Sequence, residues 1–143
     1  MNAAKKERAV IDEGLIRQSV LEDRAAERES NAPTSGAGAL QDDDEGRVEF
    51  EDVRSMVLSF KNIVRIENLQ GFEGLTRLQL DNNFLERIEN LGHLVNLEWL
   101  DISFNKISRI EGLEKLVRLK DLSLFHNQIS VRSAVDEFDL ICS

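Results

Sequence analysis

Few side chains in this sequence have the type and spacing that catalysis or metal binding requires. The only histidines are His93 and His126, and the only cysteine is Cys142. They offer no nucleophile beside a base, no metal-ligand spacing and no glycine-rich phosphate loop. The acidic run 42–45 could hold a metal ion or attract a basic partner, but such runs are more often simply solvated. The sequence therefore predicts a protein that is not an enzyme and that has no cofactor, metal site or small-molecule substrate.

The chain is organised around a stretch from Leu75 to Ile129 that repeats itself at a fixed period. Each unit has apolar residues at fixed positions and one asparagine, in the pattern L-x-x-L-x-L-x-x-N-x-L. This pattern at a fixed period is typical of leucine-rich repeats. The first unit consists of Leu75, Leu78, Leu80, Asn83, Leu85, Ile88, Leu91 and Leu94, and adding 22 and 44 to these numbers gives the corresponding residues of the next two units.

Each unit favours a short strand followed by a turn. Leu78 and Leu80 alternate with polar residues, so they point inward while their neighbours face out. The turn asparagines Asn83, Asn105 and Asn127 can bond exposed backbone groups and form a ladder. Apolar residues three apart in the rest of the unit suit a helical or 3₁₀ turn. The predicted fold class is α/β, a leucine-rich repeat solenoid with a short parallel sheet on its concave side and short helices or 3₁₀ turns on its convex side.

Three segments are predicted along the chain. Residues 1–29 are rich in helix formers and are expected to be helical from about residue 3, although Gly14 interrupts the pattern. Residues 30–47 form a polar, acidic linker that is expected to be disordered. Residues 48–143 are predicted to form about four leucine-rich repeats, the last of them incomplete. The sequence leaves open whether the helix docks on the repeats, docks on a partner or stays solvated.

The terminal repeats depart from the pattern. Residues 48–74 form a degenerate first repeat before these units, in which Lys61 replaces the asparagine, as expected of a repeat that caps a stack. In the last unit Arg132 replaces an isoleucine, so the strand 119–124 is predicted to leave an open edge unless the tail covers it. Three Arg-Ile-Glu triplets in one register are expected to form a ladder of opposite charges along the flank. They span residues 65–67, 87–89 and 109–111.

The net charge of −9 is unevenly distributed along the chain. Residues 1–52 carry twice as many acidic as basic side chains, whereas residues 53–130 carry equal numbers. A neutral repeat domain with acidic flanks lacks the basic surface that phosphate binding needs, so neither nucleic acid nor a membrane is an expected partner. No stretch resembles a membrane span or a signal peptide, and a single cysteine suits a reducing compartment. A cytoplasmic protein is therefore expected.

The strand positions between the inward leucines form the candidate binding surface. Trp99 occupies an outward position and is predicted to be a binding hot spot flanked by Phe125 and surrounded by three aspartates. The aspartates would favour a basic helix or loop as partner. A purely structural role for Trp99 is the alternative, and Phe60 and Phe104 could pack locally. The predicted partner-binding residues are Val57, Arg77, Gln79, Asp81, Trp99, Asp101, Phe104, Asp121, Phe125 and His126.

Three stretches resemble the family of dynein regulatory complex subunit 3, leucine-rich repeat proteins of the axoneme. They are residues 10–15 (VIDEGL), residues 78–83 (LQLDNN), and residues 99–105 (WLDISFN) together with 122–125 (LSLF). In that family more repeats and a long coiled coil follow, and the protein belongs to the nexin link that ties doublet microtubules and regulates dynein. The resemblance implies a non-catalytic scaffold of the cilium or flagellum, whose partners are other axonemal or dynein regulatory complex subunits.

The repeat unit is also similar to the class typified by the leucine-rich regulatory subunit of protein phosphatase 1. This second resemblance implies an alternative function as a regulatory or targeting subunit of a phosphatase. A third alternative is a truncated form without a stable function, because the repeat pattern fails after Ile129.

Overall fold

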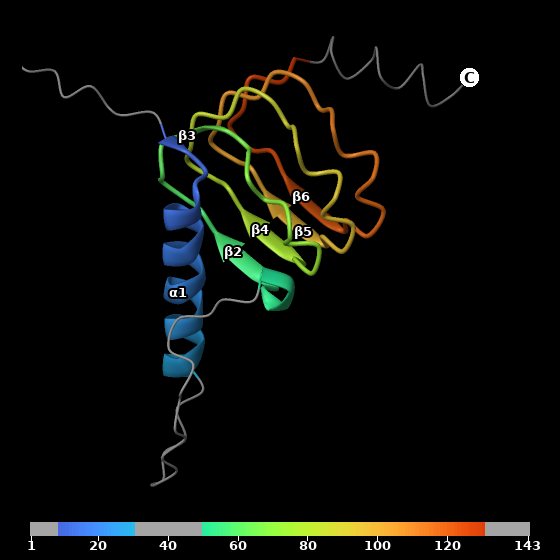
Figure 1. Cartoon of the computed structure of the whole chain (residues 1–143). Helices are drawn as coiled ribbons and strands as arrows, with labels where there is room; N and C mark the ends of the chain where they lie inside the picture. Colours follow the sequence, from blue (N-terminus) through green and yellow to red (C-terminus); the bar gives the residue numbers. More distant parts are fainter. Residues whose placement is uncertain (1–8, 31–49, 131–143) are drawn as a thin grey trace, which may run out of the picture.

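The computed structural model describes residues 9–30 and 50–130 (Figure 1). Residues 31–49, which include nearly all of the predicted linker, lie outside the described residues. Residues 131–143, with the predicted incomplete end of the last repeat, also lie outside them. The same holds for the acidic run 42–45 and for the lone cysteine.

Four parallel strands form the main sheet, in the order β2-β4-β5-β6 (Figure 1). Adjacent strands pair at equivalent positions of successive repeats, as Met56 does with Leu78 and Leu78 with Leu100. The leucine period sets this register, because a shift by one residue would turn the leucines outward. The parallel sheet fits the predicted α/β leucine-rich repeat fold. The strands are β2 (Ser55–Val57), β4 (Arg77–Gln79), β5 (Trp99–Asp101) and β6 (Asp121–Ser123).

The inward side chains of successive repeats form one continuous core. Met56, Leu78 and Leu100 lie next to one another in the register and are fully buried. Burying a side chain of this size stabilises the fold by about 1.5–3 kcal/mol. The degenerate first repeat is therefore a full member of the stack. Leu122, the fourth residue of the row, is 38% exposed, since no strand lies beyond β6 in the part of the chain that the structure describes.

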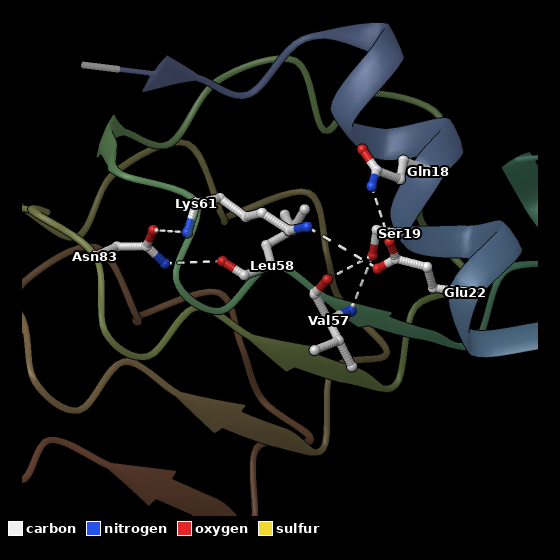
Figure 2. Close-up of polar contacts among 7 residues, drawn as sticks. All are labelled: Gln18, Ser19, Glu22, Val57, Leu58, Lys61 and Asn83. Carbon is white, nitrogen blue, oxygen red and sulfur yellow. Dashed lines mark hydrogen bonds and ion pairs between the residues drawn. The ribbon is translucent and has the colours of Figure 1, made fainter. Parts of the chain in front are cut away.

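Each ladder asparagine bonds the backbone of its own repeat and of the preceding one. Asn83 accepts two N–H groups from the preceding repeat and donates to one carbonyl there and two in its own turn. Figure 2 shows its bonds to Lys61 and Leu58. Asn105 makes four of the five equivalent contacts and Asn127 three. The predicted ladder is confirmed, with backbone groups as the partners. For Asn83 these are Lys61 N, Ile63 N, Leu58 O, Leu80 O and Asp81 O.

The segments that return from one strand to the next contain isolated turns, so of the two forms predicted there the described residues show the 3₁₀-type turn and not the short helix. Single i to i+3 hydrogen bonds close these turns, as from Leu94 N to Leu91 O (2.9 Å) and from Leu97 N to Leu94 O (3.0 Å). A helix advances about 1.5 Å per residue and extended chain about 3.3 Å, so a unit of this length leaves too little chain for a helical return. The 3₁₀ helix η1 (Phe50–Asp52) precedes β2 instead.

The N-terminal helix begins later than predicted. Helix α1 spans Glu13–Ser30, and before it the strand β1 (Ala9–Val10) pairs in parallel with β3 (Ile63–Arg65). Asp12 caps the helix, because its carboxylate accepts the N–H of the third helical residue at 2.7 Å. The expectation of helix across residues 9–12 was wrong, since these residues extend along the first repeat and end in the cap.

Helix α1 packs against β2 and covers the first edge of the sheet (Figures 1 and 2). The Ser19 hydroxyl, 1% exposed, donates to the Val57 carbonyl at 2.7 Å and accepts the Val57 N–H at 3.1 Å. An edge strand otherwise presents unpaired backbone groups. Ile16 and Val20 on either side of the serine are buried in the common core. The question that the sequence left open is thereby answered, because the helix docks on the repeats as their N-terminal cap.

The charge ladder along the flank is confirmed. Arg65 Nε lies 3.2 Å from Glu89 Oε1, and Arg87 Nε lies 3.2 Å from Glu111 Oε1, so each arginine pairs with the glutamate of the next repeat. The arginine side chains are 60% and 69% exposed. Exposed pairs contribute about 0–1 kcal/mol each, so the ladder adds little to stability.

Removal of the Ser19 hydroxyl tests the N-terminal cap. Ser19→Ala should lower the free energy of unfolding by about 1–3 kcal/mol, because the N–H and carbonyl of Val57 lose their partner in a water-poor contact. Urea denaturation of the full chain, followed by circular dichroism, measures the change. Gln18→Ala is the matched control, since Gln18 is exposed and bonds Glu22 within the helix (Figure 2). Equal effects of the two substitutions would contradict the capping contact.

The asparagine ladder predicts an order of stability losses. Asn83→Ala should cost about 2–4 kcal/mol and Asn127→Ala roughly half of that. Asn83 is buried and makes five backbone hydrogen bonds, whereas Asn127 is partly exposed and makes three. Unfolding midpoints in urea give the order, and the reverse order would argue against the ladder as the main link between repeats.

Candidate partner-binding surface

The outward face of the sheet carries two rows of side chains between the buried leucines. The strand register sets their order, and most of these side chains are partly exposed. Most of the predicted partner-binding residues therefore share one face. The first row is Ser55, Arg77, Trp99 and Asp121, and the second row is Val57, Gln79, Asp101 and Ser123.

Trp99 lies under the side chain of Arg77. The guanidinium carbon is 3.9 Å from the centroid of the indole ring, within the range of a cation–π contact. On the other side of Trp99, Asp121 is its partner in the register, as the first residue of β6. The first row thus places a cation, a large aromatic ring and a carboxylate on three consecutive strands.

Asp81 and Asp101 bond the turns that follow their strands. Asp101 accepts a backbone N–H of its own turn at 2.9 Å, and Asp81 accepts the Ser59 hydroxyl and the Asn82 amide. Burial acts to raise the pKa of Asp81, but hydrogen bonds from Ser59, Gln79 and Asn82 outweigh it and hold the pKa below its ordinary value. The side chain therefore remains a carboxylate at neutral pH.

Phe104, Phe125 and His126 form an aromatic cluster at the turns after β5 and β6. The Phe104 ring stacks on His126 with centroids 4.7 Å apart and meets Phe125 edge-on at 6.0 Å. Phe125 lies two residues past the end of β6, whereas Trp99 pairs with the first residue of that strand. The prediction that Phe125 flanks Trp99 is therefore wrong. The expectation that Phe104 packs locally holds in part, because its ring has these contacts yet stays 48% exposed.

One position in each turn, equivalent from repeat to repeat, has a left-handed backbone. Its φ angle is 57° at Phe60, 55° at Asn82, 54° at Phe104 and 51° at His126. Asparagine and histidine tolerate positive φ, whereas a bulky aromatic residue rarely adopts it. Phe60 and Phe104 therefore hold a conformation that their residue type disfavours, although they are 73% and 48% exposed.

A shallow groove of about 420 Å³ lies at these turns, bounded by Phe60 and Phe104. The register places Phe60 two repeat lengths before Phe104 on the same candidate surface, but only Phe104 was included among the predicted binding residues. The groove is lined by Phe60, Asn62, Asn82, Asn83, Phe84 and Phe104.

Other candidates are engaged in structural contacts. His93 Nε2 lies 2.7 Å from the carbonyl oxygen of Leu69 in the preceding repeat. Val57, predicted to bind a partner, is partly buried beside α1, and its backbone bonds Ser19. Within residues 9–30 and 50–130, no three His, Cys, Asp or Glu side chains gather closely enough to hold a metal ion. The one α-helix described there is not apolar enough to cross a membrane.

The lowered pKa of Asp81 predicts a specific dependence of stability on pH. Its folded-state pKa lies below the ordinary value of 3.8, so the ionised form stabilises the fold. This contribution is complete above about pH 5 and is lost as the pH falls through the lowered pKa. Asp81→Asn should therefore lose less stability than the wild type between about pH 5 and pH 2. Urea unfolding across this range measures the two profiles, and parallel profiles would contradict the prediction.

Comparison with known proteins agrees with the repeat pattern and the register of the sheet. Residues 73–129 match the sequence model of the leucine rich repeat family. The match begins after β2, although the structure shows that the preceding repeat pairs in the same sheet. No curated protein matches the chain significantly. Residues 73–129 are thus similar to leucine-rich repeats, and the repeat register and the parallel sheet agree with this similarity.

Proposed function

We propose that this protein is a non-catalytic adaptor that binds a partner protein on the outward face of its sheet. Leucine-rich repeat domains are typically interaction modules without catalytic activity, and the family match supports this class of function. The partner lies across the strands β4, β5 and β6, where the side chains of both outward rows are available. The long N-terminal cap leaves that region open, because the element that α1 packs against is β2.

The contact between Arg77 and Trp99 carries this proposal. Tryptophan and arginine are among the residue types most enriched in binding hot spots, because they combine a large contact area with directional polar groups. Here the guanidinium covers the indole ring, and both side chains lie outside the buried core. A partner can therefore bury both side chains without first disrupting the core.

The charges on the same face favour a basic segment of the partner. Asp101 lies two residues after Trp99 on β5, and Asp121 lies opposite it on β6. Arg77 is the one basic residue in the two rows, and its charge is directed over the indole ring. Lysine or arginine side chains of the partner would meet the two aspartates at the edge of the tryptophan, which favours specificity and a fast association rate.

A role in the axoneme is the finer part of the proposal. The three stretches that resemble the family of dynein regulatory complex subunit 3 support a scaffold that holds other subunits of that complex in a cilium or flagellum. Two of these stretches supply Trp99, Asp101 and the turn residues of the binding face. The remaining stretch, residues 10–15, contains the helix cap Asp12. Its similarity supports an N-terminal architecture shared with that family.

Substitution of Trp99 tests the proposed face. In titrations of the full chain against purified dynein regulatory complex subunits, Trp99→Ala should weaken binding at least about tenfold, as expected for a hot spot. Its melting temperature should stay close to that of the wild type, since Trp99 lies outside the core. Val117→Ser is the control, because Val117 is 83% exposed in the turn before β6 and should leave binding unchanged.

The same titrations separate the alternatives. Full binding by Trp99→Ala would contradict the sheet face as the binding site. Binding to the catalytic subunit of protein phosphatase 1, with none to the axonemal subunits, would replace the axonemal role by phosphatase regulation. A melting curve without a cooperative transition would instead indicate a form without a stable fold.

A further inference from the structure

We propose that the groove between Phe60 and Phe104 receives one large apolar side chain of the partner, with a lysine or arginine next to it facing Asp81. The inference deepens the proposed function, on which it rests, by assigning the partner's anchor a place and a chemistry. The groove lies at the turns that follow the strands, separate from the contact between Arg77 and Trp99.

The backbone at the two walls provides the first argument. Phe60 and Phe104 adopt φ angles of 57° and 54°, in the left-handed region that Asn82 and His126 occupy in the other two repeats. A non-glycine residue held in this region is strained, and such strain gathers at functional sites. Neither phenylalanine is compensated by full burial, since Phe60 is 73% and Phe104 is 48% exposed. Folding alone therefore does not account for aromatic residues at these two positions.

The width of the groove suits a single side chain. Phe60 and Phe104 stand at equivalent positions two repeats apart, and two strand spacings amount to about 10 Å. Asn82 occupies the intervening repeat and is shorter than either phenylalanine. With the thickness of the rings subtracted, the space matches one phenylalanine or leucine side chain, not a whole helix.

One wall of the groove is held in place before a partner arrives. Phe104 stacks on His126 at 4.7 Å between centroids and meets Phe125 at 6.0 Å. These neighbours limit the rotation of the Phe104 ring, so less conformational entropy is lost when a partner binds. The groove is therefore partly preorganised for an apolar anchor.

The charge beside the groove specifies what accompanies the anchor. The side-chain amide of Asn82, which lines the groove, donates to the carboxylate of Asp81. Asp81 as a whole residue is partly exposed. At the other end, Lys106 Nζ lies 5.2 Å from the Phe84 ring centroid, so the basic charge there is already placed over an aromatic face. The acidic side at Asp81 therefore favours a basic neighbour of the anchor.

Three synthetic peptides with blocked termini test the proposal on the ¹⁵N-labelled full chain by NMR. They are Lys-Ser-Phe-Ser-Lys, Lys-Ser-Ala-Ser-Lys and Glu-Ser-Phe-Ser-Glu. The first should shift the side-chain amide signals of Asn82 and the backbone signals around Phe104 in a saturable manner. The alanine peptide should bind at least about tenfold more weakly, and the glutamate peptide at least about threefold more weakly. Equal shifts from all three, or saturable shifts located elsewhere, would overturn the proposal.

Two substitutions separate binding from folding. Phe60→Asn and Phe104→Asn introduce the residue that the second repeat has at this position, so the left-handed backbone becomes less strained. Each variant should keep or raise the melting temperature while weakening the first peptide at least about fivefold. Val117→Ser is the exposed apolar control and should change neither quantity. A loss of binding that follows a loss of stability, or unchanged binding, would contradict the groove.

The outcome is distinguishable from that of the proposed function. Retained peptide binding in Phe60→Asn, together with weaker partner binding in Trp99→Ala, would overturn the groove and leave the adaptor role standing. Weaker peptide binding in Phe60→Asn, together with full partner binding in Trp99→Ala, would overturn the sheet face as the binding site and leave the groove standing. If the NMR signals of the groove shift with protein concentration in the absence of peptide, a second copy of the chain occupies the groove. That result would overturn the proposal of a partner's apolar anchor.

Discussion

The stack of repeats depends on one constraint, namely that every turn after a strand exposes backbone groups that must find partners away from water. A buried asparagine side chain meets this need because it carries both a donor and an acceptor. Asn83, Asn105 and Asn127 bond their own turn and also reach back to the preceding repeat. Each asparagine therefore couples two repeats, and their even separation along the chain keeps the repeats in register.

The backward direction of these bonds explains how the first repeat differs from the others. Lys61 occupies its asparagine position, and Asn83 of the next repeat bonds the backbone of Lys61 and Ile63. No repeat precedes this one in the described residues, so an asparagine at position 61 would have no earlier turn to bond. The backbone groups at the open edge of this first repeat have other partners. The Ser19 hydroxyl bonds Val57 in β2, and β1 pairs with β3.

The sequence predicted the features that recur in every repeat, namely the buried leucines and the turn asparagines. It missed features that depend on contacts of individual side chains. Periodic leucines and asparagines specify burial and register, because both follow from spacing alone. The placement of Phe125 was wrong, since the turn after β6 directs its ring to Phe104 and His126. The helix start was misjudged from helix-forming composition, although Asp12 is a recognisable capping residue. On the return segments the sequence left short helices and 3₁₀ turns both open, because spacing of three fits isolated turns as well as helices.

Repetition within the chain also separates residues that fold it from residues that give it a specific surface. The position of Leu78 keeps an apolar side chain in every repeat, and that of Asn83 keeps asparagine in every repeat but the first, because the stack requires it. In the outward row the same register position holds serine, arginine, tryptophan and aspartate in turn, so the stack leaves that choice free. The left-handed position differs from both. Its backbone favours asparagine, yet Phe60 and Phe104 occupy it. A residue type that opposes its local backbone and gains little burial has its physical justification in something outside the fold, which is the reason to look for a partner's anchor at these turns.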